Sequence, residues 1–86
     1  MTNANDLANR LSRVQGQIEA IKKSILAGED KECLKTMQQL KAINNAIKKF
    51  GEAYVSHHFD ECLNTKVPKR DLERDMKEII NATFTL

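Results

Sequence analysis

The sequence feature that most constrains the fold is an unbroken stretch, residues 32–63, which contains no proline and a single glycine, Gly51. Its apolar residues recur every three or four positions, the spacing of one face of an α-helix. They are Leu34, Met37, Leu40, Ile43, Ile47, Phe50, Tyr54, Val55 and Phe59. This pattern predicts a single helix of about 30 residues, much longer than the average helix of a globular domain. Because one helix cannot bury so long a stripe alone, the stretch must pack against other helices.

Three soft ligands lie at the two ends of this predicted helix, Cys33 at the front and His58 and Cys62 at the back. His58 and Cys62 are four residues apart, so they share a helix face and can bind one ligand. Cys33 precedes His58 by 25 residues, which is roughly 38 Å along an intact helix. We therefore expect an antiparallel helical-bundle homodimer, in which Cys33 of one protomer meets His58 and Cys62 of the other. Two-fold symmetry, the commonest in oligomers, forms two such sites at once.

Length and composition bound the class of protein. With 86 residues, 41% hydrophobic and 30% charged, the chain has little core of its own and suits one amphipathic all-α domain. No run reaches the length of a membrane span, and the N-terminus lacks the apolar core of a signal peptide. We therefore expect a cytoplasmic protein with no membrane partner, whose two reduced cysteines are ligands or redox sensors. With no Gly-rich phosphate loop and no nucleophile–base pair other than Cys and His, we expect no enzyme.

A second apolar pattern precedes the long stretch. Its members step by four and three residues in turn, which is a regular heptad seam. They are Leu7, Leu11, Val14, Ile18, Ile21 and Ile25. Asp6 is a candidate N-cap, in competition with Asn3 and Asn5, and Gly28 suits the left-handed position that ends a helix. Gly16 lies inside this helix but off the seam, where we expect it to allow the close approach of another helix.

A third, shorter apolar pattern follows Pro68, which suits the first turn of a helix. Its members are Leu72, Met76, Ile79 and Ile80. The sequence therefore predicts one domain over residues 1–86, a three-helix protomer with helices at about residues 6–27, 32–64 and 68–82. The first two helices would form an antiparallel hairpin across a short turn.

The net charge of +2 does not by itself indicate nucleic acid, but its distribution is uneven. Residues 1–50 carry nine basic and five acidic side chains, and residues 51–86 carry five basic and seven acidic. Assembly of several copies would concentrate the basic part. Arg10 and Arg13 share a helix face away from the seam.

Two segments carry a resemblance to a known family. Residues 10–18 read RLSRVQGQI and residues 38–43 read QQLKAI. These two segments, and the spacing of Cys33, His58 and Cys62 relative to them, resemble the sequence signatures of the copper-sensing operon repressor (CsoR) family. The resemblance covers about residues 7–65. The resemblance implies an all-helical dimer of dimers that represses transcription and leaves its operator DNA when an inducer binds.

In that family the DNA surface is formed by basic residues spread over the first two helices, not by a helix-turn-helix. Arg10 falls at a family DNA-contact position, and Lys49 occupies another that is Arg in some relatives. With their neighbours on the same part of the chain, the expected DNA-binding residues are Arg10, Arg13, Lys48 and Lys49.

The ligand set predicts the inducer. Copper(I) is soft and favours thiolate, with imidazole as a good companion, so the set Cys33, His58 and Cys62 resembles that of the copper-sensing branch. Glu78, in the third helix, matches an acid of copper sensors that would hold the second ring nitrogen of the histidine. Many of those sensors carry Tyr before the first cysteine, where this chain has Glu32. We therefore expect copper(I) as the inducer.

Other inducers stay open at this point. The persulfide-sensing branch also has two cysteines and does not require the histidine. The formaldehyde-sensing branch resembles this chain in Cys33 and His58 but lacks the second cysteine. Nickel and cobalt sensors add an N-terminal His, and this chain has none before His57. From a different class, the same helices would suit a copper-buffering protein with no DNA role, and a homodimer and a homotetramer are both compatible with the sequence.

Overall fold

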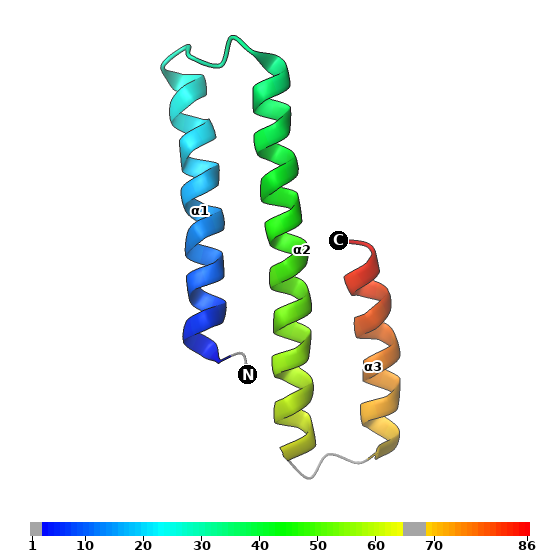
Figure 1. The fold of residues 1–86 in the computed structure, drawn as a ribbon. Coiled ribbons are helices and arrows are strands. Elements are labelled where there is room, and N and C mark those ends of the chain that lie inside the picture. The colour runs from blue at the N-terminus through cyan, green and yellow to red at the C-terminus, as the bar shows by residue number, and fades with distance from the viewer. Residues whose placement is uncertain (1–2, 65–68) are drawn as a thin grey trace.

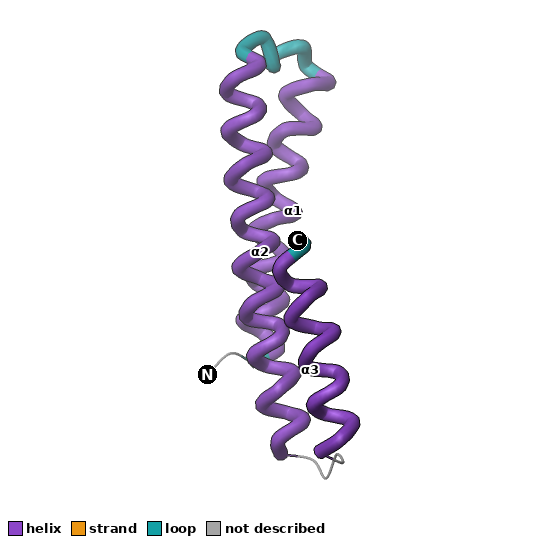
Figure 2. Tube along the Cα trace, turned by 90° about the vertical axis from the view of Figure 1, so that its right-hand side faces the viewer, coloured by secondary structure: helices purple, strands orange, loops and turns teal. Residues whose placement is uncertain are grey.

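The computed structural model describes residues 3–64 and 69–86, with the side chains of residues 62–64, 69 and 72 outside the described part. The helices are α1 (Ala4–Leu26), α2 (Cys33–Asn64) and α3 (Lys69–Phe84). The first two form an antiparallel hairpin, and α3 runs back along the second half of α2 (Figure 1; Figure 2). The result is a rod measuring 54 × 25 × 17 Å. The predicted all-α, three-helix protomer is confirmed.

The first helix begins earlier than predicted. Asn3 has extended backbone angles, and its Oδ1 accepts a hydrogen bond of 2.9 Å from the backbone N–H of Asp6. Asn3 is therefore the N-cap, and the candidate Asp6 instead lies in the first turn, where its carboxylate favours the helix dipole. At the other end Gly28 has a φ of 69°, which confirms the predicted left-handed residue after the helix.

The second helix is continuous for 32 residues, from Cys33 to Asn64. Gly51 lies within this helix and does not interrupt it. The predicted start of the third helix at Pro68 lies outside the described residues. Across the described ranges, no helix combines the length and apolar character needed to cross a membrane.

The apolar seam of α1 is divided into two rows. Leu7, Val14 and Ile21 are no more than 9% exposed, and we call them the inner row. Val14 and Ile21 form the buried core with Ile43 of α2, against which Ala46 and Ile47 pack. The alternate residues are 44–51% exposed, and we call them the outer row: Leu11, Ile18 and Ile25. Folding of the protomer therefore buries only half of the seam.

The two glycines inside helices have different surroundings. A Cβ atom added to Gly16 would meet nothing within 4 Å, so no helix of the protomer approaches closely at this residue, and an approach by a helix of another chain stays a prediction. A Cβ atom on Gly51 would lie 2.6 Å from Cδ1 of Leu86. The last residue of the chain therefore packs against the bare backbone of α2 at Gly51.

Candidate metal centre and nucleic-acid interface

The two ends of α2 hold the predicted metal ligands apart. Cys33 opens the helix with an exposed thiol, and His58 follows 25 residues later on the same continuous helix. At 1.5 Å per residue they are roughly 38 Å apart, too far to share a ligand in one protomer. Cys62 lies one turn beyond His58 in α2, and its side chain is outside the described part. Elsewhere in the described residues, no three His, Cys, Asp or Glu side chains gather into a metal-binding group.

His58 lies among aromatic side chains. Its ring is nearly parallel to that of Tyr54, with an interplanar angle of 9° and a centroid separation of 6.5 Å. Phe59 lies at 6.3 Å with its ring tilted by 48°. Tyr54 stacks in turn on Phe50 at 5.9 Å. The imidazole is therefore the last ring in a row of three along one helix face, because the three residues are four apart.

The surface around His58 is hollowed on two sides. One groove, of about 400 Å³, separates α2 from the start of α1, and His58 and Tyr54 line it opposite Leu7 and Leu11. A second groove, of about 390 Å³, separates α2 from α3, and the same two rings line it opposite Ile79 and Ala82. His58 is thus reached from both sides of the helix, which suits a ligand supplied by another chain.

The neighbouring His57 has a different environment. Its Nε2 lies 3.2 Å from Oε1 of Glu61, one turn further along α2, and its side chain is 24% exposed. This pair lies on the groove toward α1. The Glu61 contact and the aromatic row thus give the two adjacent histidines different surroundings.

The structure places Glu78 on the solvent-exposed side of α3. The residues of α3 that line the groove beside His58 include Ile79, Ala82 and Thr83. The role of Glu78 toward His58 therefore stays a prediction.

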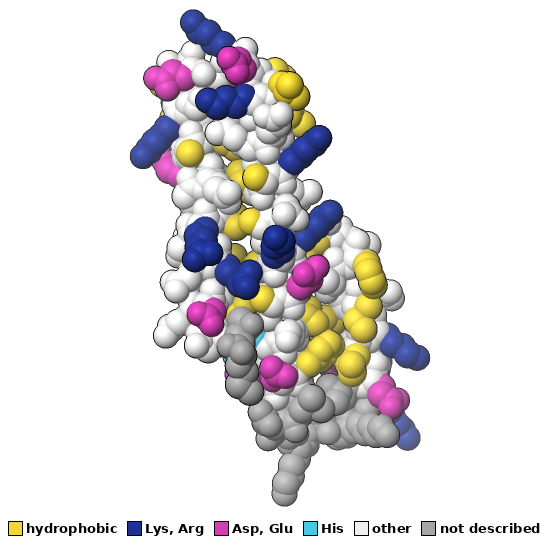
Figure 3. All heavy atoms as spheres, viewed as in Figure 1, with side chains coloured by type: hydrophobic (Ala, Val, Ile, Leu, Met, Phe, Trp, Pro, Cys, Tyr) yellow, Lys and Arg dark blue, Asp and Glu magenta, His cyan; other side chains and the backbone are white. Residues whose placement is uncertain are grey.

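The four predicted DNA-binding residues are all exposed and lie at one level of the hairpin. Val14 packs near Ile43 and Ile47, so the antiparallel arrangement sets Arg10 and Arg13 beside the part of α2 that carries Lys48 and Lys49. Figure 3 shows basic side chains gathered over the middle of the hairpin. Such a cluster is suited to phosphate groups.

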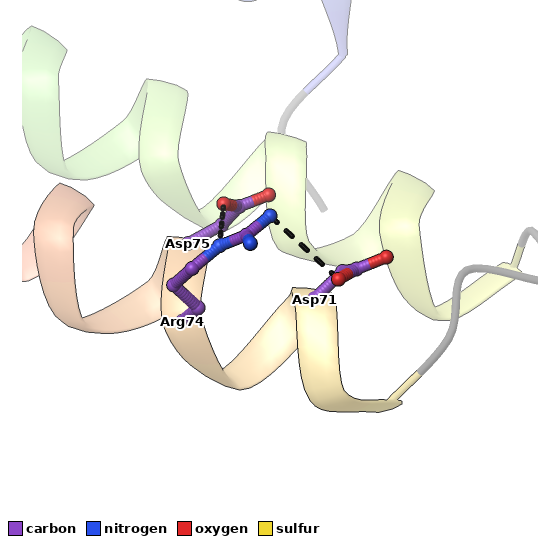
Figure 4. Close-up of polar contacts among 3 residues, drawn as sticks. All are labelled: Asp71, Arg74 and Asp75. Carbon is purple, nitrogen blue, oxygen red and sulfur yellow. Dashed lines mark ion pairs between the residues drawn. The ribbon is translucent and has the colours of Figure 1, made fainter.

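Charge is distributed differently over the rest of the molecule. From residue 33 to residue 50, α2 carries four lysines and no carboxylate, whereas residues 51–64 carry three carboxylates and neither Lys nor Arg. On α3 the guanidinium of Arg74 is engaged by Asp71 at 3.6 Å and Asp75 at 3.7 Å (Figure 4). Among the described residues, the first half of α2 is therefore the helical segment in which basic side chains are not balanced by carboxylates.

The outer row lines grooves at two levels of the α1–α2 hairpin. Ile18 and Ile25 line an open apolar groove of about 430 Å³ with Leu40 of α2, and Leu11 lies on the groove beside His58. Leu34, Met37 and Leu40 are also exposed at the front of α2. An apolar surface of this extent is typical of a protein–protein interface.

Sequence reasoning missed the stacking of Tyr54 on His58. The apolar pattern predicts only that Tyr54 belongs to the stripe of α2, although its spacing of four residues from His58 is the signal for a contact along a helix. Its side chain is 52% exposed, which the stripe did not predict.

Comparisons with known proteins give a consistent result. A family model described as "Metal-sensitive transcriptional repressor" matches residues 3–84. The copper-sensing transcriptional repressor RicR of Mycobacterium tuberculosis (strain ATCC 25618 / H37Rv) is 30% identical over 63 residues. That alignment covers 73% of this chain and 64% of RicR, so the chain spans less than two thirds of this relative's length. No solved structure matches the chain at a significant level.

Proposed function

Because the chain belongs to the metal-sensitive transcriptional repressor family, we propose that it is a repressor whose inducer is copper(I), bound between two protomers by Cys33 of one and His58 and Cys62 of the other. The family is one of DNA-binding repressors and not of enzymes. Copper as the inducer is supported by the likeness to a copper-sensing relative and by a donor set of two thiolates and one imidazole.

One observation carries the proposal. The continuous helix from Cys33 to Asn64 separates Cys33 from His58 by roughly 38 Å in a single protomer. A site that uses both ends of α2 therefore requires a second, antiparallel copy. The ligand set fits a soft metal only in such an assembly.

The apolar surface supports the same arrangement. The outer row runs from the groove with Leu40 to the groove beside His58. A second copy that covered this row in the antiparallel sense would bring its own α2 front, with Cys33, toward His58. We further propose that the basic cluster formed by Arg10, Arg13, Lys48 and Lys49 binds operator DNA, in a homodimer or a dimer of dimers.

The inducer can release DNA only by favouring one geometry of the assembly over another. A site shared between protomers is sensitive to how they are placed, so ligand binding selects the placement that brings Cys33 to His58. DNA release follows if the four basic residues fit DNA better in a different placement. By linkage, DNA must weaken inducer binding by the same factor.

The shared site is tested by mixing two defective protomers. Cys33→Ala and Cys62→Ala homodimers should each lack a three-ligand site. A heterodimer of the two, isolated through different affinity tags, should regain one complete site and bind half as much copper(I) as wild type in an anaerobic titration. Full copper affinity in a stable monomer would contradict the proposal.

A second candidate is a persulfide sensor in the same family, in which Cys33 and the partner's Cys62 form a disulfide or polysulfide. The exposed thiol of Cys33 favours it, because sensor cysteines must be accessible to their oxidant. His58→Ala separates the two readings, since it should abolish DNA release by copper(I) and leave release by persulfide intact. A copper-buffering protein would bind copper(I) and fail to shift its own upstream DNA in an electrophoretic assay.

A further inference from the structure

The ring of His58 stacks on that of Tyr54 at an exposed position of α2. Tyr54 lies one helical turn before His58 and stacks on it at 9° and 6.5 Å. Tyr54 is 52% exposed, and His58 is exposed as well. On this open helix face the two rings are not aligned by the close packing of a core, and the aromatic contact favours the parallel arrangement.

Tyr54 is itself oriented by a second aromatic contact, with Phe50. Phe50 is half-buried and stacks on Tyr54 at 5.9 Å with an interplanar angle of 29°. The row therefore starts at a ring anchored near the core and ends at the imidazole. Phe59 follows His58 in the chain, and its ring is tilted by 48° relative to the imidazole. It lines a third groove, between α2 and α3, with Ile80 and Phe84.

Tyr54 also accompanies His58 on both sides of α2. The two rings line the groove toward α1 and the groove toward α3 together. A turn of the imidazole about its Cβ–Cγ bond, other than a half turn, would lose the parallel contact. The plane of the ring, in which its two nitrogen atoms lie, is thus coupled to Tyr54.

We propose that Tyr54 is a positioning residue for His58: its ring fixes the plane in which the imidazole presents a nitrogen atom to the ligand that bridges two protomers. This inference rests on the proposed role of His58 as a metal ligand. A fixed imidazole loses less rotational freedom when it binds a metal, so the stack raises affinity without touching the metal. From the strength of aromatic pairs we expect the stack to change copper(I) affinity by about two- to tenfold.

The first test uses metal-free protein and nuclear magnetic resonance. In wild type we expect nuclear Overhauser contacts between the ring protons of Tyr54 and His58, with His57 signals identified through His57→Gln. Tyr54→Leu should shift the His58 ring protons, because it removes an aromatic ring current, and Tyr54→Phe should leave them near their wild-type positions. Absence of the ring–ring contacts in wild type would overturn the proposal, whatever the variants do.

The second test measures copper(I) affinity with a chromophoric competitor. Tyr54→Leu should bind about two- to tenfold more weakly than wild type, and Tyr54→Phe should restore affinity, because only the ring is needed. Phe59→Leu is the matched control, since it removes a ring that also neighbours His58 but does not stack on it, and it should bind like wild type.

Circular dichroism and sedimentation must first show that the variants keep their helices and their assembly state. Wild-type affinity in Tyr54→Leu, combined with lost affinity in His58→Ala, would overturn the positioning role and leave the proposed metal site standing. Retained affinity in His58→Ala would overturn the ligand set, and with it any effect of Tyr54 on metal binding.

Discussion

The inner and outer rows of α1 have the same chemistry and opposite environments. Leu7, Val14 and Ile21 are 6–9% exposed, whereas Leu11, Ile18 and Ile25 are 44–51% exposed. Both rows are aliphatic, follow the same seven-residue period and lie on the same helix. The difference shows that α2 of the same chain covers one row and leaves the other uncovered. In the proposed assembly, a second molecule covers the outer row.

This division assigns different tasks to neighbouring residues. The inner row should control whether the hairpin forms, and the outer row should control whether hairpins associate. A third face of α1 carries Arg10 and Arg13, which belong to neither row. Substitutions on the three faces should therefore separate folding, assembly and DNA binding.

The largest effect is expected in the inner row. Ile21→Ala removes a side chain that packs with Val14 and Ile43, so it should lower the free energy of unfolding by about 2–5 kcal/mol. The measurement is urea denaturation followed by circular dichroism. The loss should be the same at low and high protein concentration, and a loss confined to low concentration would move Ile21 into the subunit interface.

The next effect is expected in the outer row. Ile18→Asp places a charge on the apolar groove shared with Ile25 and Leu40, so it should weaken self-association by about 2–3 kcal/mol, the size of an interface hot spot. Sedimentation velocity should show smaller species with helical content preserved. Ala20→Asp, which adds the same charge at an exposed position on the opposite face of α1, is the control and should associate normally. If both variants associate like wild type, the outer row is not the interface.

The three helices could be predicted from the sequence, because the periodicity of apolar residues and the scarcity of Pro and Gly are local features of the chain. The sequence was not sufficient to divide the seam, since alternating positions of a heptad pattern are chemically equivalent until a partner covers one of them. The N-cap at Asn3 was uncertain for a related reason. Asn3, Asn5 and Asp6 all carry a suitable oxygen, and only the backbone geometry decides among them.

The candidate site was predictable to a similar degree. The separation of Cys33 from His58 follows from the fixed rise of a helix, so it was available from residue numbers alone. The stack of Tyr54 on His58 was not, because it depends on side-chain rotamers and on which part of the stripe stays uncovered. The ligand set and the DNA-binding residues stay predictions that rest on the proposed assembly.

A smaller effect is expected on the charged face. Arg10→Ala should weaken operator binding by about 1–2 kcal/mol and reduce the dependence of affinity on salt by about one phosphate contact. Unfolding and self-association should not change, because Arg10 is exposed and lies outside both rows. Fluorescence anisotropy with the upstream DNA gives the affinity over a series of salt concentrations.

The matched control for that experiment is Arg74→Ala. Arg74 is an exposed arginine on α3 whose guanidinium is engaged by Asp71 and Asp75, so it should contribute little to DNA binding. Equal losses in the two variants would show a response to net charge alone. Unchanged affinity in Arg10→Ala would place the DNA surface elsewhere on the molecule.

The smallest effect is expected at Gly16, which belongs to neither row. Alanine is favoured over glycine inside a helix by about 1 kcal/mol, and a Cβ at this position meets nothing within the protomer. Gly16→Ala should therefore raise the free energy of unfolding by up to about 1 kcal/mol, measured in urea. Gly51→Ala should gain less, because its Cβ would press on Leu86, and Leu86→Ala should restore the gain. If Gly16→Ala instead weakens assembly, a helix of the partner approaches α1 at this glycine, and the interface extends beyond the outer row.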